Sequence, residues 1–187
     1  SISLVQTKHK NAYRNVSKAV TALDPTAYMP MLETAEVVSQ RYNISRQEQD
    51  IYSLQSQQRT AAAQAAGLFD AEIVPMKTVR AEFNKETRET TYEDAVVDRD
   101  DCNRPSTTLE SLMALEPVFK DGQWVKEGKF ITAGNSSQLS DGASACVVME
   151  ARLASQKGLS PLGIYRGLAV AGCKSDEMGI GPVFAVP

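Results

Sequence analysis

A short polar segment, Thr132–Ala143, holds the residue types best suited to bind a ligand. It contains two glycines, an asparagine, an aspartate and three serines between two apolar stretches. Gly134 and Gly142 permit tight turns or the close approach of a ligand to the backbone. Asn135 and Asp141 can hydrogen-bond nearby backbone groups and lock such turns. The spacing predicts a rigid polar loop at a strand end, which serves either as a structural turn or as the wall of a binding site.

The three cysteines and the single histidine are the other candidates for chemistry. Cys146 lies in an apolar stretch where a small buried residue is expected, whereas Cys102 lies in a charged segment and Cys173 follows a glycine. His9 lies between two lysines with no carboxylate nearby in the sequence. We interpret all four as structural or solvent-exposed. An odd number of cysteines without paired spacing predicts neither a disulfide framework nor a zinc site.

Composition limits the class of protein. The 187 residues suffice for one ordinary domain with a sizeable core, and 42% hydrophobic with 23% charged residues is typical of a soluble globular chain. A net charge of −3 with interspersed signs argues against a nucleic-acid partner. The sequence has neither an apolar run of about 20 residues nor a signal peptide at its start. These features predict a cytoplasmic protein without a membrane partner.

Two helices must position the polar loop from the amino-terminal side. One is predicted at 31–41, with Leu32, Ala35 and Val38 on its apolar face and Asn43 as its stop. The second is predicted at 45–66. It opens on a capping box formed by Ser45 and Glu48, and Gly67 ends it in the left-handed conformation.

The remaining segments predict shorter elements. A capping box at Thr107–Glu110 opens a helix that stops near Pro117, and another helix ends at Gly158. The charged run 77–101 predicts a solvated hairpin, and 1–27 predicts a polar surface arm or a contact loop between subunits. Strands are predicted at 71–76, 129–132, 144–149 and 163–171. Helices that alternate with strands indicate a layered α/β architecture.

Residues 134–143 of the polar loop read GNSSQLSDGA, which closely resembles the signature GN-(A/S)-S-x-x-(S/N)-DGA of the thiolases. Other stretches resemble the same family in the same order, namely Glu33–Glu36, Ile44–Asp50, Arg104–Leu112 and Met178–Pro182. The resemblance covers nearly the whole chain. It implies the α/β thiolase-like fold, with residues 1–137 as the loop domain that binds coenzyme A (CoA). Residues 138–160 would then be the closing strand and helix of the N-terminal half, and 161–187 the start of the C-terminal half.

The resemblance also implies a chemistry. Thiolases make or break the carbon–carbon bond of a 3-ketoacyl-CoA through a cysteine acyl-enzyme, with oxyanion holes that stabilise the thioester oxygens. The family's nucleophile precedes the matching region, and its Gly-His-Pro and Cys-x-Gly motifs follow it; none of these motifs occurs here. We therefore expect the chain to be an internal piece of an acyltransferase and to be inactive alone. The alternative is a non-catalytic CoA-binding or subunit-assembly module.

The family's pocket residues transfer to positions in this sequence. By resemblance, Arg104 packs against the CoA adenine, Ser111 lies near the nucleotide, Ala133 and Ser137 contact the pantetheine arm, and Met31 and Met178 line the acyl end. Without the resemblance, the methionines would be interpreted as core residues and the arginine as a surface residue. A departure also occurs, since many short-chain thiolases have His-Met-Gly where this chain has Pro30–Leu32.

The implied partners are acyl-CoA and CoA, with CoA as a substrate and no metal or cofactor. A homodimer or homotetramer is expected for the full-length protein. The sequence does not determine the acyl-chain length or whether synthesis or degradation is the physiological direction.

Overall fold

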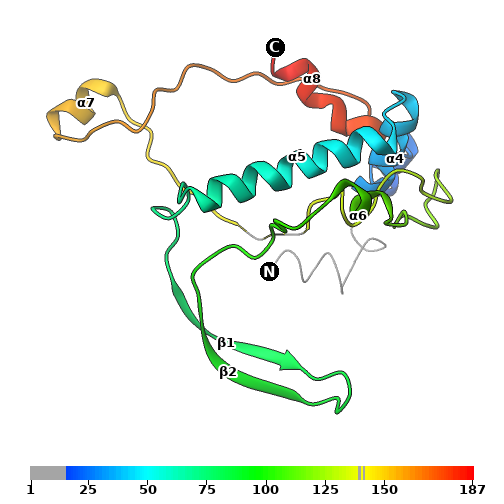
Figure 1. Ribbon diagram of the computed structural model, residues 1–187. Coiled ribbons are helices and arrows are strands. Elements are labelled where there is room, and N and C mark those ends of the chain that lie inside the picture. The colour runs from blue at the N-terminus through cyan, green and yellow to red at the C-terminus, as the bar shows by residue number, and fades with distance from the viewer. Residues whose placement is uncertain (1–15, 139, 141) are drawn as a thin grey trace. The chain divides into compact units, whose positions relative to one another are not determined.

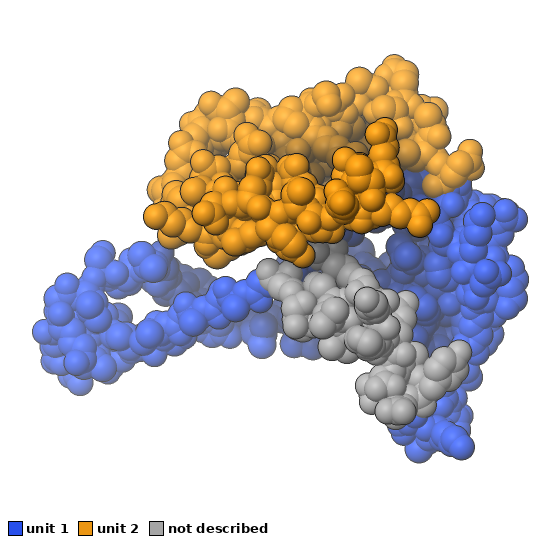
Figure 2. Space-filling model, turned by 90° about the horizontal axis from the view of Figure 1, so that it is seen from below, with its two compact units in different colours: residues 1–45, 117–187 blue, residues 46–116 orange. Residues whose placement is uncertain are grey.

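The computed structural model describes residues 16–138, 140 and 142–187 (Figure 1). It divides into two compact units, which are coloured separately in Figure 2. Unit 1 combines Ser1–Ser45 with Pro117–Pro187, and unit 2 is Arg46–Glu116. The domain boundaries expected at 137/138 and 160/161 stay predictions. His9 and most of the polar arm predicted at 1–27 lie outside the described residues, but α3 (Lys18–Leu23) gives the described end of that arm a helical turn that was not predicted.

Unit 2 is built on α5 (Arg46–Ala65), its longest helix. The sequence predicted this helix at 45–66, and Gly67 has the expected left-handed backbone with φ +68°. The strand predicted at 71–76 is wrong. The chain instead makes successive turns, in which the amide of Asp70 bonds to the carbonyl of Gly67 and the amide of Glu72 to that of Phe69.

The charged run forms an antiparallel hairpin, as predicted. β1 (Met76–Phe83) pairs with β2 (Thr90–Val97), from Met76 opposite Val97 to Phe83 opposite Thr90. Almost every residue in both strands is exposed. The hairpin is a distinct ribbon in Figure 1.

The short helix α6 (Leu109–Met113) begins one residue later than the predicted capping box requires. Thr108 is the N-cap, since its hydroxyl accepts from the amide of Ser111 at 3.2 Å and the Ser111 hydroxyl accepts from the Thr108 amide at 3.1 Å. Serine thus fills the reciprocal role assigned to Glu110. The helix ends before Pro117, as predicted.

Unit 1 contains α4 (Met31–Arg41), α7 (Ala151–Gln156), the 3₁₀ helix η1 (Ser175–Ile180) and α8 (Gly181–Ala185). The prediction of α4 is confirmed, and Asn43 follows it with a positive φ of 53°. The helix end at Gly158 is also confirmed, because α7 stops two residues earlier and Gly158 has φ +66°.

The strands predicted at 129–132, 144–149 and 163–171 are not strands in the described part of the chain. Residues 144–149 and 163–170 are extended or irregular and exposed, Cys146 included, which corrects its expected burial. A strand exists only through a hydrogen-bonded ladder with a neighbour, and no ladder reaches these segments among the described residues. An apolar sequence alone therefore did not decide their structure.

The side chains that are most deeply buried are polar. Glu33, Glu36, Asp50 and Thr132 are each at most 2% exposed. The predicted apolar face of α4 is wrong in this respect, because Leu32 is exposed while both glutamates are buried. Within the described residues, no helix is long and apolar enough to cross a membrane.

Candidate functional site

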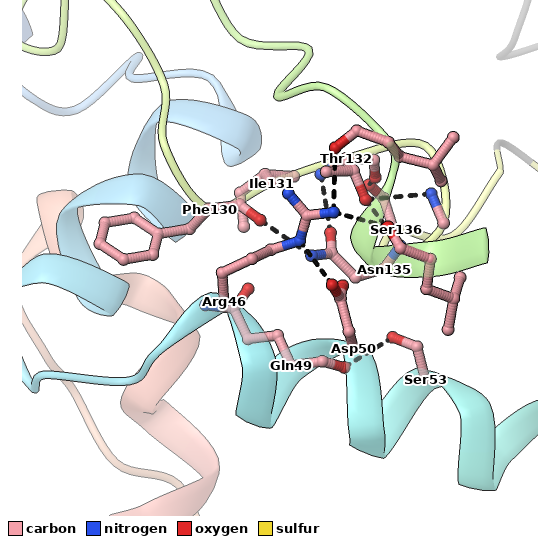
Figure 3. Close-up of polar contacts among 12 residues, drawn as sticks. Arg46, Gln49, Asp50, Ser53, Phe130, Ile131, Thr132, Asn135 and Ser136 are labelled. Atoms are coloured by element: carbon pink, nitrogen blue, oxygen red, sulfur yellow. Dashed lines mark hydrogen bonds and ion pairs between the residues drawn. The ribbon is translucent and has the colours of Figure 1, made fainter. Parts of the chain in front are cut away.

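The polar loop begins with a tight network around Thr132 and Asn135. The Asn135 carboxamide accepts from the amide of Thr132 at 2.8 Å and donates to the carbonyl of Phe130 at 2.8 Å (Figure 3). The Thr132 hydroxyl accepts from the amide of Gly134 at 3.2 Å, and the Ser136 hydroxyl donates to the Thr132 carbonyl. The predicted locking role of Asn135 is confirmed. Asp141, given the same role, lies outside the described residues.

Within this network, some residues of the loop are buried and others lie at the surface. Thr132 is fully buried, whereas Ala133 and Ser137 are exposed. The Ser137 hydroxyl bonds only to the neighbouring carbonyl of Gln138 among the hydrogen bonds of the described residues, at 2.9 Å. Both residues predicted to contact pantetheine are therefore open to a ligand on a backbone whose geometry is fixed by Asn135.

Two carboxylates from α4 support the segment that leads into this loop. Glu33 accepts from the amides of Trp124 and Val125, and Glu36 accepts from the amides of 129–131. Sequence reasoning missed both residues. The available signal was a pair of acidic residues three positions apart on α4, together with Gly122 and Gly128 in the segment that the carboxylates contact.

The predicted acyl-end methionines lie on two elements of unit 1 that pack together. Met31 is the first residue of α4, and Met178 lies in η1. Met31 is 73% exposed and Met178 is 49% exposed, so neither is a buried core residue in this structure. Exposed thioethers on adjoining elements can contact an acyl chain, which is the role that the resemblance gave them.

An ionic cluster, the Arg41 latch, ties η1 to α4. The Arg41 guanidinium contacts Asp176 at 2.6 Å and Glu177 at 2.5 Å, and the Tyr42 hydroxyl donates to Glu177 at 3.0 Å. Nearby, the Ser175 hydroxyl donates to Asp24 at 2.6 Å. Because Glu177 directly precedes Met178, the latch fixes the backbone that carries this methionine.

The latch should be sensitive to acid. Hydrogen bonds from Arg41 hold the pKa values of Asp176 and Glu177 below their usual range. Because folding lowers these pKa values, their contribution is complete above the unfolded values of about 4 and is lost as the pH falls through the folded values. We expect Arg41→Gln to lower stability at pH 7 and to matter less at pH 3, measured by urea unfolding. An equal deficit at both pH values would contradict this account.

In unit 2, α5 holds the segment 103–115, which carries the other two predicted site residues. The Asn103 carboxamide donates to Gln64 at 2.9 Å, and the amide of Arg104 donates to Gln57 at 2.8 Å. The side chains of Arg104 and Ser111 are exposed. The Ser111 hydroxyl is already engaged in capping α6, so its first role is structural.

Arg46 completes this support from the start of α5. Its guanidinium contacts Asp50 at 2.7 Å, as drawn in Figure 3. It also donates to the carbonyls of Leu112 at 2.6 Å and Leu115 at 3.0 Å, and so satisfies carbonyls at the end of α6. Sequence reasoning gave Arg46 and Asp50 no role beyond the family resemblance.

Unit 2 contains a hollow of about 440 Å³, which the sequence neighbours of Arg104 help to line. Asn103 and Pro105 line it, together with Gln64, Phe69, Asp70, Ile73, Asp98, Arg99, Asp100 and Asp101. Its acidic lining disfavours a phosphate, although a flat uncharged ring would not be repelled. Among the described residues, no cluster of three or more His, Cys, Asp or Glu side chains could hold a metal ion.

The predicted site residues thus fall into two groups, one in each unit. Unit 1 contributes Met31, Ala133, Ser137 and Met178, and unit 2 contributes Arg104 and Ser111. All six are exposed. Their assignment to parts of a CoA ligand stays a prediction.

Comparison with curated proteins gives consistent relatives. The chain is 46% identical over 159 residues to the peroxisomal 3-ketoacyl-CoA thiolase B of Rattus norvegicus, covering 85% of this chain and 35% of that protein. It is 42% identical over 164 residues to a 3-ketoacyl-CoA thiolase of Bacillus subtilis, covering 87% of this chain and 40% of that protein. The chain therefore spans well under half the length of the relatives that it matches.

Solved structures agree in fold. Human mitochondrial 3-ketoacyl-CoA thiolase in complex with CoA aligns with a TM-score of 0.67 at 39% identity, over 87% of this chain and 36% of that one. The acetyl-CoA acetyltransferase of Bacillus anthracis aligns with a TM-score of 0.69 at 36% identity, over 87% and 37% of the two chains. The α/β thiolase-like fold class is thereby confirmed.

The family model described as "Thiolase, N-terminal domain" matches residues 3–152, which include the whole of the polar loop and the α4 and α5 helices that precede it. This chain belongs to the thiolase family.

Proposed function

We propose that the protein containing this chain is an acyl-CoA acyltransferase. It would catalyse Claisen condensation or thiolytic cleavage of a 3-ketoacyl-CoA through a cysteine acyl-enzyme. This chain would supply residues of the CoA and acyl pocket. The observation that carries the proposal is the polar loop of a thiolase-family chain, in which Asn135 fixes the backbone while Ala133 and Ser137 remain exposed.

The residues of this chain would bind and orient the substrate. The Arg104 guanidinium is planar and exposed, so it can stack on the adenine ring. The backbone at Ala133 and the hydroxyl of Ser137 can hydrogen-bond the pantetheine amides. Met31 and Met178 would line the acyl end. Holding the thioester in one position lowers the entropic cost of attack by the family's cysteine.

The complete protein should cleave acetoacetyl-CoA in the presence of CoA, followed as loss of the 3-ketoacyl thioester. The 187-residue chain, purified alone and confirmed by its intact mass, should show no turnover, because the cysteine and histidine motifs of the family are absent from it. Turnover by the homogeneous chain would contradict this assignment. A complete protein that binds CoA but cleaves no 3-ketoacyl-CoA would favour a non-catalytic role.

Replacing Arg104 with methionine tests the adenine contact. The expected loss is about 1 kcal/mol of stacking, or roughly fivefold in the Kd for CoA. Calorimetry with pantetheine is the matched control, since pantetheine lacks the nucleotide and should bind the variant and the parent equally. Equal weakening of both ligands, or of neither, would remove Arg104 from the adenine site.

One observation favours a second candidate, a subunit-assembly role. The hairpin register places Val79 and Phe83 on the same face as Tyr92 and Val96. All four side chains are more than half exposed, and an uncovered apolar ribbon is a common feature of a contact surface. We propose that this face contributes to a homodimer or homotetramer, which sedimentation of the complete protein would test through Phe83→Ser.

We further propose that CoA acts as a substrate and that the reaction requires no metal or other cofactor. The name of the rat relative places that protein in peroxisomes, and the name of the human relative places that one in mitochondria. The cytoplasmic location that the sequence predicts for this protein therefore remains a proposal.

A further inference from the structure

Two buried carboxylates on α4 have an unusual set of partners. Glu33 is 1% exposed and Glu36 is 2% exposed. The ion pairs among the described residues include neither of them. Their partners are backbone amides between residues 124 and 131. A buried anion is costly unless it is well hydrogen-bonded, so these contacts must be specific.

Glu36 uses both of its oxygens. Oε1 accepts from the amides of Phe130 at 3.1 Å and Ile131 at 2.8 Å. Oε2 accepts from the amides of Lys129 at 2.9 Å and Phe130 at 3.2 Å. Three successive amides thus converge on one carboxylate, as amides converge on an anion in a backbone nest.

Glu33 differs in one respect. Its Oε1 accepts from the amides of Trp124 at 2.5 Å and Val125 at 2.8 Å. Its Oε2 is buried and has no hydrogen-bond partner among the residues that the structure describes. The contacts of Glu33 with the backbone therefore use one carboxylate oxygen, whereas those of Glu36 use both.

Two glycines permit the close approach of the backbone. A Cβ at Gly128 would lie 2.8 Å from Glu36 Oε1, and a Cβ at Gly122 would lie 2.6 Å from Glu33 Oε1. Both distances are shorter than a Cβ tolerates. Gly122 thus makes room for Glu33, and Gly128 separately makes room for Glu36.

The Glu36 contacts run directly into the polar loop. The amide of Phe130 donates to Glu36, and the carbonyl of the same residue accepts from Asn135. Asn135 in turn accepts from the amide of Thr132, directly before Ala133. Phe130 thus links the buried Glu36 carboxylate to the network that fixes the loop. The Glu33 contacts end at Val125, on the far side of Gly128 in the sequence.

We propose that Glu36 is a positioning residue for acyl-CoA binding. Its carboxylate fixes the backbone at 129–131 and thereby sets the geometry at which Ala133 and Ser137 meet the pantetheine arm. The inference rests on the proposed function and deepens it, since it assigns the loop's geometry to a side chain that does not touch the ligand.

Glutamine substitutions separate this role from a general structural one. In Glu36→Gln, the carboxamide NH2 group must face the backbone N–H groups of 129–131, so hydrogen-bond donors face one another. In Glu33→Gln, the carboxamide oxygen can accept from the same two backbone amides as Glu33 Oε1 does. The carboxamide NH2 group then takes the position of Oε2. Glu33→Gln is therefore the matched control, on the same helix and at similar burial.

The test measures the Kd of CoA and of adenosine 3′,5′-bisphosphate for the complete protein, together with kcat and KM for thiolysis. Glu36→Gln should raise the Kd and KM for CoA about tenfold. It should leave the Kd of the bisphosphate and kcat at saturation close to those of the parent. Glu33→Gln should leave all four quantities unchanged.

An unchanged Kd for CoA in Glu36→Gln, or equal weakening of CoA and the bisphosphate, would overturn the inference while the proposed function stood. Failure of the parent protein to bind CoA would overturn both. If Glu36→Gln does not fold, Glu36→Asp carries the test, because it keeps both acceptor oxygens but withdraws them by one methylene. It should show the same selective loss for CoA, and equal affinity to the parent would reject the positioning role.

Discussion

Asn135→Ala is expected to lower the affinity of the complete protein for CoA at least tenfold and its free energy of unfolding by about 2 kcal/mol. The substitution removes the acceptor for the amide of Thr132 and the donor for the carbonyl of Phe130. Thr132 is fully buried, so its amide has little access to water. An unsatisfied buried group costs about 1–3 kcal/mol. Calorimetry with CoA and urea unfolding would measure the two effects.

Asn135→Asp is the matched variant. It has the same shape and keeps the acceptor for Thr132, but it loses the donor to Phe130. We expect a defect in CoA binding between those of the parent and of Asn135→Ala. If alanine at this position left CoA binding intact, the loop would be a structural turn and not part of the binding site.

Arg46→Met is expected to destabilise the protein by about 3 kcal/mol, because it breaks an ion pair with a fully buried carboxylate. The same change leaves the carbonyls of Leu112 and Leu115 without their guanidinium donor. Loosening α6 should also raise the Kd for CoA, because the segment 103–115 carries Arg104 and Ser111. Urea unfolding gives the stability, and calorimetry gives the affinity.

Two variants control for this prediction. Arg80→Met removes an ion pair with Glu93 in which both side chains are more than half exposed, and such pairs contribute at most about 1 kcal/mol. Arg46→Lys keeps the charge but lacks the planar fork that reaches three acceptors, so it should be intermediate. Equal stability of Arg46→Met and Arg80→Met would mean that Arg46 does not support α6.

The sequence predicted the elements whose signals are local. The helices α4 and α5, the left-handed residues after them and the charged hairpin depend on capping, periodicity and charge within a few residues. The predicted start of α6 was one residue too early. Thr107 and Thr108 are both good N-caps, and the capping box that forms between Thr108 and Ser111 decides between them. The strands failed because a strand requires a partner, which no local pattern specifies.

The site was predicted in part for the same reason. Asn135 was identified because its bonds reach only three and five residues along the chain. Glu36 was missed because its partners lie more than 90 residues away. An acidic residue inside a helix normally faces water, and α4 reverses that rule by burying its carboxylates and exposing Leu32. Long-range contacts of this kind leave almost no trace in a single sequence.

If the proposed function is right, the polar loop and the segment around Arg104 each contact CoA in the complete protein. Hydrogen exchange of the complete protein, followed by mass spectrometry with and without CoA, would measure both contacts. We expect CoA to slow exchange in peptides covering 132–137 and 103–111 and to leave exchange in the hairpin at 76–97 unchanged. CoA binding that protects neither of the two segments would contradict this expectation.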